Sequence, residues 1–121
     1  MESTEKIDRI LEKDKDRIKF IVLYGSFAEG TQRAESDVDL CVYYDGSERE
    51  RFEFRKKVLG DLPSNYDVQT FQDLPIYVKK NVIKGELLYG DYDFFFWTVR
   101  ETIREWEDSK HRYELLFGAK K

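Results

Sequence analysis

Two short hydrophobic runs near the start of the chain constrain its fold more than any other feature. The first run, Ile18–Tyr24, is rich in β-branched and aromatic residues and stops at Gly25, as expected of a buried strand. The second run, Val38–Tyr44, alternates in character and is followed by Asp45-Gly46, a dipeptide that favours a turn. Both runs therefore predict strands, and strands of this kind must be covered by other elements.

Helical patterns flank these strands. Apolar residues at helical spacing among charges predict a first helix over about the first dozen residues, starting near Ser3 or Thr4. Ser47 and Glu50 have the spacing of a capping box, which predicts a charged helix that ends at Gly60. We expect this helix to turn three apolar side chains inward: Phe52, Val58 and Leu59.

The second half of the chain continues this mixture. We expect a strand over Tyr66–Phe71, a helix from Pro75 through Lys84, and a short strand over Glu86–Tyr89. A long amphipathic helix should run from about 91 to 117. Its predicted apolar stripe consists of Phe96, Val99, Ile103, Trp106, Tyr113 and Phe117.

These elements predict an α/β (α+β) fold in which a small mixed sheet is covered by helices. The order of the strands in that sheet cannot be derived from the pattern. A chain of 121 residues has the size of a single domain, so we expect one domain over residues 1–121.

Composition narrows the functional classes. The formal net charge is −4 with 38% charged residues, which argues against an extended nucleic-acid surface, since such surfaces are usually basic. No apolar run approaches the roughly 20 residues that span a bilayer, and the first residues are polar rather than signal-like. The single Cys41 cannot form an internal disulfide, which agrees with a reducing compartment. We therefore expect a cytoplasmic protein without a membrane partner.

The residues best suited to bind a ligand lie at the two ends of the loop that joins the predicted strands. Gly25 permits a sharp turn and close approach to a ligand, while Ser26 offers a hydroxyl and backbone N–H groups that favour phosphate. Asp37 and Asp39 are two residues apart and so project to the same side, with Cα atoms roughly 6.5 Å apart. Their mutual repulsion favours a cation, and hard Mg²⁺ binds carboxylate and phosphate oxygens together.

A third carboxylate normally completes a two-metal phosphoryl-transfer site, whose ions lie about 3.5–4 Å apart. Asp67 is the best candidate, because it lies in the third predicted strand, which could adjoin the edge that carries Asp37 and Asp39. A strand-edge acid that simply faces solvent is the alternative reading of Asp67.

The arrangement Gly25-Ser26, ten residues, then Asp37-Val38-Asp39 resembles the signature of the DNA polymerase β-like nucleotidyltransferase superfamily. The string from Gly25 to Gly30, together with Ser36 to Leu40, is similar to the small MNT branch, whose members are often encoded beside HEPN-domain toxins. This resemblance implies that Asp37, Asp39 and Asp67 are catalytic and hold two Mg²⁺ ions. It also implies that ATP or another nucleoside triphosphate is the substrate, held at Gly25 and Ser26.

One residue departs from the family pattern. Glu29 stands where the family usually has arginine, so a cation near the phosphates would be missing unless Arg33 replaces it. Two functions remain open at this point. The first is transfer of AMP from ATP to a hydroxyl on a HEPN toxin, with this chain as antitoxin. The second is a catalytically weak antitoxin that neutralises its toxin by occlusion.

Two further expectations concern partners. A small-molecule nucleotidyltransferase of the aminoglycoside type would need a further domain to hold its acceptor, and the length of the chain argues against that class. The predicted final helix would extend about 32 Å along its apolar stripe at 1.5 Å per residue. A domain of this size has a radius of gyration of only about 13–14 Å. We therefore expect the far end of the helix to contact the HEPN protein or a second copy of the chain.

Overall fold

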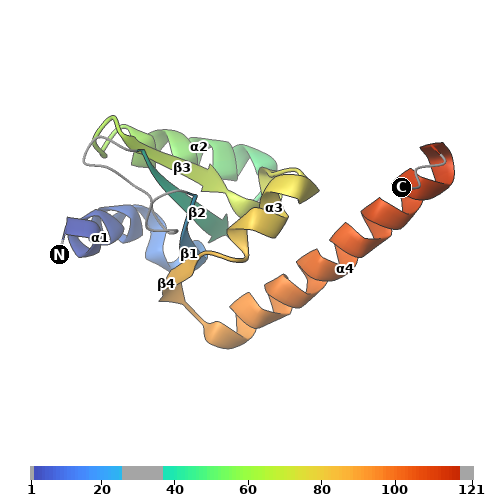
Figure 1. The fold of residues 1–121 in the computed structure, drawn as a ribbon. Coiled ribbons are helices and arrows are strands. Elements are labelled where there is room, and N and C mark those ends of the chain that lie inside the picture. Colours follow the sequence, from blue (N-terminus) through green and yellow to red (C-terminus); the bar gives the residue numbers. More distant parts are fainter. Residues whose placement is uncertain (1, 26–36, 118–121) are drawn as a thin grey trace.

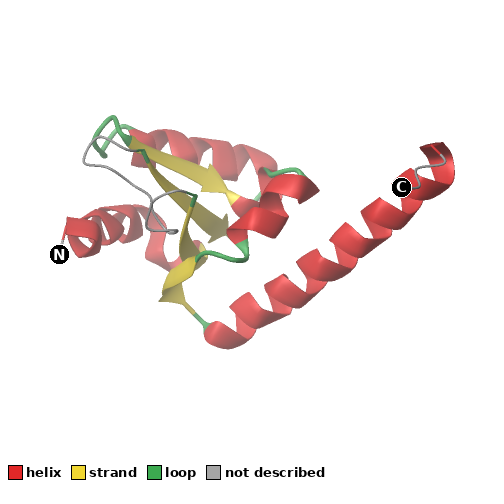
Figure 2. Ribbon diagram, viewed as in Figure 1, coloured by secondary structure: helices red, strands yellow, loops and turns green. Residues whose placement is uncertain are grey.

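The computed structural model describes residues 2–25 and 37–117, which form a four-stranded sheet with helices on both faces (Figures 1 and 2). Two short 3₁₀ turns, at 15–17 and 71–73, lie between the main elements. In chain order the helices and strands are α1 (Glu2–Asp14), β1 (Ile18–Tyr24), β2 (Val38–Tyr44), α2 (Glu48–Leu59), β3 (Tyr66–Thr70), α3 (Ile76–Val82), β4 (Glu86–Gly90) and α4 (Tyr92–Phe117).

The sheet has the strand order β3-β2-β1-β4 and is mixed. Strand β1 pairs antiparallel with both β2 and β4, whereas β2 and β3 run parallel. Strand β3 is consequently an edge strand, and the starts of β2 and β3 lie next to the end of β1. The predicted α/β class with a small mixed sheet is confirmed, and the structure supplies the strand order.

The core has two halves, one on each face of the sheet. On one face, α1 and α2 cover inward side chains of β1, β2 and β3, including Leu40 of β2 and Val68 of β3. On the other face, α3 and the start of α4 cover Phe20, Val22 and Cys41. Alternate residues of β2 therefore enter different halves of the core, and Asp39 begins the side that α3 and α4 cover.

The predicted strands over Ile18–Tyr24 and Val38–Tyr44 have those bounds in the structure. The capping box is also confirmed, since Ser47 accepts a hydrogen bond from the Glu50 backbone and the Glu50 side chain accepts one from the Ser47 backbone. The expectation for the inward face of α2 was partly wrong. Phe52 is 56% exposed, and Phe54 is the buried aromatic residue of this helix, at 3%.

Helix α4 confirms the predicted length but only part of the predicted stripe, because Val99 packs against the core and Trp106 is half-buried. The buried side chains of α4 are Phe95, Thr98 and Thr102, whereas Phe96 and Ile103 are exposed. The helix runs away from the sheet, and its C-terminal end lies well clear of the other elements (Figure 1). Within residues 2–25 and 37–117, no helix, α4 included, is both long and apolar enough to cross a membrane.

Candidate active site

The end of β1 and the start of β2 bring a glycine against a carboxylate. Tyr24 is the register partner of Asp39, and the following Gly25 has φ +81°, a conformation that side chains disfavour. A Cβ atom on Gly25 would lie 2.6 Å from Asp39 Oδ2. The backbone angle therefore favours glycine here, and an added Cβ would also displace the carboxylate of Asp39.

Asp39 and Asp67 are register partners in the parallel β2–β3 pair, so their carboxylates start from neighbouring positions on one face of the sheet. Burial raises the pKa of Asp39 above its ordinary value, and the carboxylates of Asp67 and then Asp37 raise it further. The carboxylate of Asp39 thus lies where negative charge is unfavourable unless a cation is present. The predicted juxtaposition of β3 with the Asp39 edge is found in the structure.

Two side chains that the sequence reasoning did not consider hold Asp67. Gln69 Nε2 donates a hydrogen bond of 2.9 Å to Asp67 Oδ2, and Arg55 Nη2 lies 3.5 Å from Asp67 Oδ1. The Nε of Arg55 also donates to the carbonyl oxygen of Val68. Gln69 could have been found from the period of a strand, because residues two apart share a face. Arg55 carried no such signal, since it comes from a different element.

Tyr24 is a third side chain of this site that the sequence reasoning did not consider. It is half-buried, and burial raises the pKa of its hydroxyl far above the ordinary value, with further contributions from Cys41, Asp39 and Asp67. Arg55 acts in the opposite direction on the same pKa. Tyr24 is therefore a neutral phenol beside the carboxylates at neutral pH.

Asp37 is the one remaining predicted metal ligand that the structure describes. Asp37 is exposed and directly precedes β2. Ser26, Glu29 and Arg33 lie outside the described residues, so their roles stay predictions. Within the described ranges, no three His, Cys, Asp or Glu side chains already have the arrangement of a metal site. The donors themselves fit Mg²⁺, because carboxylate oxygens are the ligands that this hard cation prefers.

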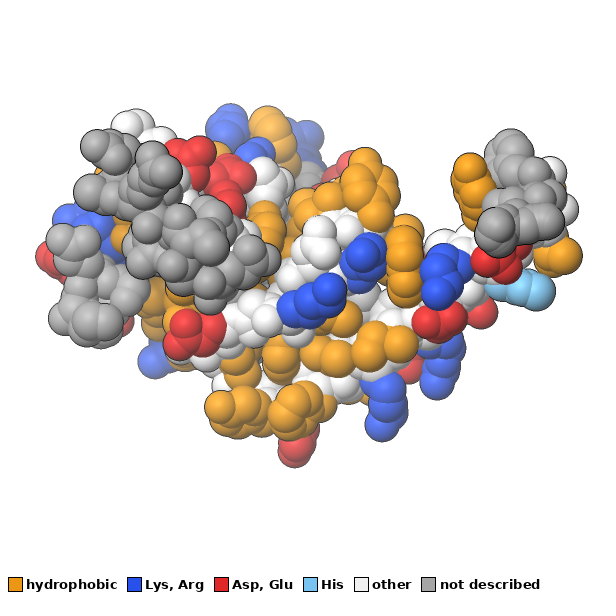
Figure 3. Space-filling model, in the orientation of Figure 1, with side chains coloured by type: hydrophobic (Ala, Val, Ile, Leu, Met, Phe, Trp, Pro, Cys, Tyr) orange, Lys and Arg blue, Asp and Glu red, His pale blue; other side chains and the backbone are white. Residues whose placement is uncertain are grey.

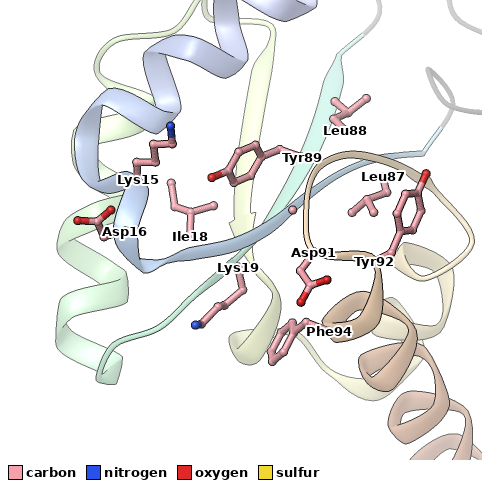
Figure 4. Close-up of a pocket in the computed structure, with 11 residues that line it drawn as sticks. Lys15, Asp16, Ile18, Lys19, Leu87, Leu88, Tyr89, Asp91, Tyr92 and Phe94 are labelled. Carbon is pink, nitrogen blue, oxygen red and sulfur yellow. The ribbon is translucent and has the colours of Figure 1, made fainter.

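A hollow lies at the opposite end of β1 and is separate from the aspartates. It measures about 790 Å³ and is lined by residues at the start of β1, along β4 and at the start of α4, among them Lys19, Tyr89 and Tyr92 (Figure 4). None of Asp37, Asp39 and Asp67 lines it. We base the candidate site on the carboxylates, because the register of β2 and β3 places Asp39 beside Asp67, whereas the hollow contains none of the three predicted aspartates.

Comparison with known proteins identifies the family of the chain. The family described as Polymerase beta, Nucleotidyltransferase matches residues 5–109. Protein adenylyltransferase MntA of Shewanella oneidensis is 27% identical over 88 residues, which is 70% of this chain and 63% of MntA.

A protein of Methanocaldococcus jannaschii, named as a candidate protein adenylyltransferase, is 36% identical over 72 residues, or 59% of this chain. The match spans only 55% of that relative, about half its length. A second protein of the same organism and description is 36% identical over 87 residues, which is 64% of this chain and 81% of that protein.

Solved structures share the fold. A crystal structure of a toxin-antitoxin with AMP-PNP matches with a TM-score of 0.76 at 22% identity, covering 94% of both chains. A structure of tri-AMPylated Shewanella oneidensis HEPN toxin in complex with MNT antitoxin matches with a TM-score of 0.70 at 18% identity, covering 98% of this chain and 97% of that chain. At these identities the likeness establishes the fold alone. With the family match over residues 5–109, it follows that the chain belongs to the polymerase beta nucleotidyltransferase family.

Proposed function

We propose that this chain is an adenylyltransferase that moves AMP from ATP to a hydroxyl of a partner protein, a HEPN-type toxin, and so acts as its antitoxin. The observation that carries the proposal is the pairing of Asp39 with Asp67 directly beside Gly25. The names of the relatives, protein adenylyltransferases in two organisms, support the choice of AMP and of a protein acceptor.

Each residue of the site has a proposed part in the transfer. Gly25, Ser26 and Arg33 hold the triphosphate, and Asp67 accepts the proton of the acceptor hydroxyl. A bond forms between the acceptor oxygen and the α-phosphorus, and the bond from that phosphorus to pyrophosphate breaks. Two Mg²⁺ ions held by Asp37, Asp39 and Asp67 would neutralise the charge on the triphosphate and on the departing pyrophosphate.

The proposed protein partner fits the exposed end of α4. Leu115 and Leu116 are 71% and 73% exposed near the C-terminal end of this helix. Figure 3 shows hydrophobic side chains exposed at both ends of α4. Structures that match this fold are toxin–antitoxin complexes, which favours a HEPN partner at this surface over a second copy of the chain. We propose the cytoplasm as the place of action, where the free, buried Cys41 stays reduced.

Occlusion without transfer is the second candidate. Glu29 favours it, because a carboxylate at the position where the family usually has arginine would repel the triphosphate. The intact set Asp37, Asp39 and Asp67 favours transfer instead. The two candidates make different predictions for a variant that keeps the fold but lacks the carboxylate charges.

The deciding experiment uses labelled ATP, the partner encoded beside this chain, and the Asp37→Asn/Asp39→Asn double variant. Transfer predicts label on the partner with the wild type and none with the variant, together with loss of protection of growing cells. Occlusion predicts protection by both proteins and label with neither. Calorimetry with ATP, with and without Mg²⁺, tests the metal requirement, and equal affinity in both conditions would contradict it.

A further inference from the structure

Arg55 reaches from one side of the sheet to a carboxylate on the other. It belongs to α2, which covers the face that contains Leu40 and Val68. Asp67 is the neighbour of Val68 in β3 and therefore points to the opposite face. The guanidinium spans the two faces at the edge of the sheet, where its Nη2 lies 3.5 Å from Asp67 Oδ1.

The position of this guanidinium is fixed by the edge strand. Strand β3 has a neighbour on one side only, so some of its outward backbone groups need partners from elsewhere. The Nε of Arg55 provides one by donating to the Val68 carbonyl oxygen. Because the guanidinium is planar and rigid, anchoring Nε also fixes the place of Nη2 beside Asp67.

Both oxygens of Asp67 consequently have a protein partner. Gln69 holds Oδ2 at 2.9 Å, and Arg55 pairs with Oδ1. Each carboxylate oxygen has two lone pairs, so these contacts orient Asp67 and leave further acceptor sites for a ligand. The charge of Arg55 also offsets the repulsion between Asp67 and its register partner Asp39.

We propose that Arg55 is a positioning residue and the counter-ion of Asp67. Its first effect is to hold the carboxylate of Asp67 in place. Its second effect is to lower the affinity of the site formed by Asp37, Asp39 and Asp67 for a divalent cation without nucleotide. The second part rests on the proposed function. A cation in the site would lie close to the guanidinium and be repelled by it. A cation that arrives with a triphosphate brings compensating negative charge, so the site would favour the metal–nucleotide complex over the free ion.

The first test measures Mn²⁺ binding by calorimetry to the nucleotide-free protein. Arg55→Met should tighten binding about threefold to tenfold, because a positive charge a few ångströms from the cation is removed in partly solvated surroundings. The Mn²⁺ affinity of Arg55→Lys should lie between those of Arg55→Met and the wild type. Lysine keeps the positive charge but lacks the planar guanidinium that the Val68 carbonyl oxygen holds in place. Unchanged or weaker binding in Arg55→Met would overturn the proposal.

Arg51 provides a matched control on the same helix. It lies one turn before Arg55, forms an ion pair of 2.7 Å with Asp73, and donates to the Gly46 carbonyl oxygen. Arg51→Met therefore removes an arginine–aspartate ion pair that is shorter than the pair of Arg55 with Asp67, and it leaves the contacts of Asp67 unchanged. Its Mn²⁺ affinity should equal that of the wild type. Tightening of the same size in both variants would show a general charge effect and overturn the specific role of Arg55.

A second test needs no metal and separates this proposal from the proposed function. The effect of Asp67→Asn on urea unfolding in EDTA is measured in the wild-type and Arg55→Met backgrounds. Asp67→Asn should be clearly more destabilising when Arg55 is present, because the substitution then leaves the guanidinium without its partner. Equal effects in both backgrounds would overturn the counter-ion assignment. Failure of the wild type to bind Mn²⁺ would instead contradict the proposed metal site.

Discussion

The ring of Phe54 stacks on the ring of Tyr44, with centroids 4.3 Å apart and planes inclined by 21°. This contact ties α2 to β2, the strand that carries Asp39. Phe54→Ala should lower the free energy of unfolding by about 3–5 kcal/mol, because it opens a cavity in the core. Phe52→Ala should cost less than about 1 kcal/mol, since Phe52 is exposed and contributes mainly its contact with Lys56. Urea denaturation of both variants measures the difference. Equal losses of unfolding free energy would contradict the orientation of α2, in which Phe54 faces the core and Phe52 faces solvent.

The turn at Gly25 should tolerate no side chain. Gly25→Ala places a methyl group 2.6 Å from Asp39 Oδ2, at a residue whose φ is +81°. We expect the free energy of unfolding to fall by about 1 kcal/mol or more. We also expect the protein to bind the metal–triphosphate complex at least tenfold more weakly. Gly60→Ala is the matched control, because Gly60 has an ordinary helical φ of −67° and its nearest neighbours to an added Cβ lie 3.6 Å away. It should leave nucleotide binding unchanged and keep or raise stability. Nucleotide affinity that survives in Gly25→Ala would show that Asp39 is not needed in its observed position.

Asp73 should make the stability of the protein depend on pH at the acidic end. The hydrogen bonds from the Arg51 guanidinium lower the pKa of Asp73 below its ordinary value, aided by the Thr70 hydroxyl. Because the folded state favours the charged form, this stabilisation is present above the unfolded pKa of about 4 and is lost as the pH falls through the folded value. Asp73→Asn should therefore cost about 1 kcal/mol at pH 7. The difference in stability between this variant and the wild type should begin to shrink as the pH falls below about 4, and it should vanish only below the folded pKa of Asp73.

The convergence is checked by urea unfolding between neutral and acidic pH. Asp108→Asn, at an exposed position of α4, is the control for removing a carboxylate elsewhere. A constant difference between Asp73→Asn and the wild type at every pH would show that the ion pair is not the source of the effect.

The exposed end of α4 should mediate association with the proposed partner. The substitutions Leu115→Glu and Leu116→Glu should each weaken the complex about tenfold or more, because they place a charge in an apolar contact. The apolar stripe predicted from the sequence also contains Trp106, but Trp106 is half-buried and the Lys80 ammonium lies 4.7 Å from its ring centroid. Changing Trp106 would therefore also disturb the contact between α3 and α4.

Sedimentation of the chain alone and with the neighbour-encoded protein measures the association. His111→Glu adds the same charge at another exposed position of the helix and should leave the complex intact. A chain that stays monomeric and ignores the partner, or equal losses in all three variants, would contradict a specific contact at Leu115 and Leu116.

The sequence by itself determined the local elements and the location of the chemistry. The bounds of β1 and β2 follow from short runs with strand character that end at glycine or a turn dipeptide, and the start of α2 follows from Ser47 and Glu50. These signals are readable because each depends on residues within a few positions of one another. The spacing of Gly25, Asp37 and Asp39 likewise identified the family before any contact was known.

Tertiary structure decided what depends on the relative placement of elements. Consecutive aromatic residues in α4 and the alternating Phe52 and Phe54 in α2 are compatible with more than one helix rotation, and packing against the sheet selected the buried ones. The pairing of Asp39 with Asp67 required the strand order, which depends on contacts between strands far apart in the sequence rather than on any local pattern. The contact of Arg55 with Asp67 depends further on how α2 crosses the edge of β3, because a long side chain reaches its partner only once both backbones are fixed.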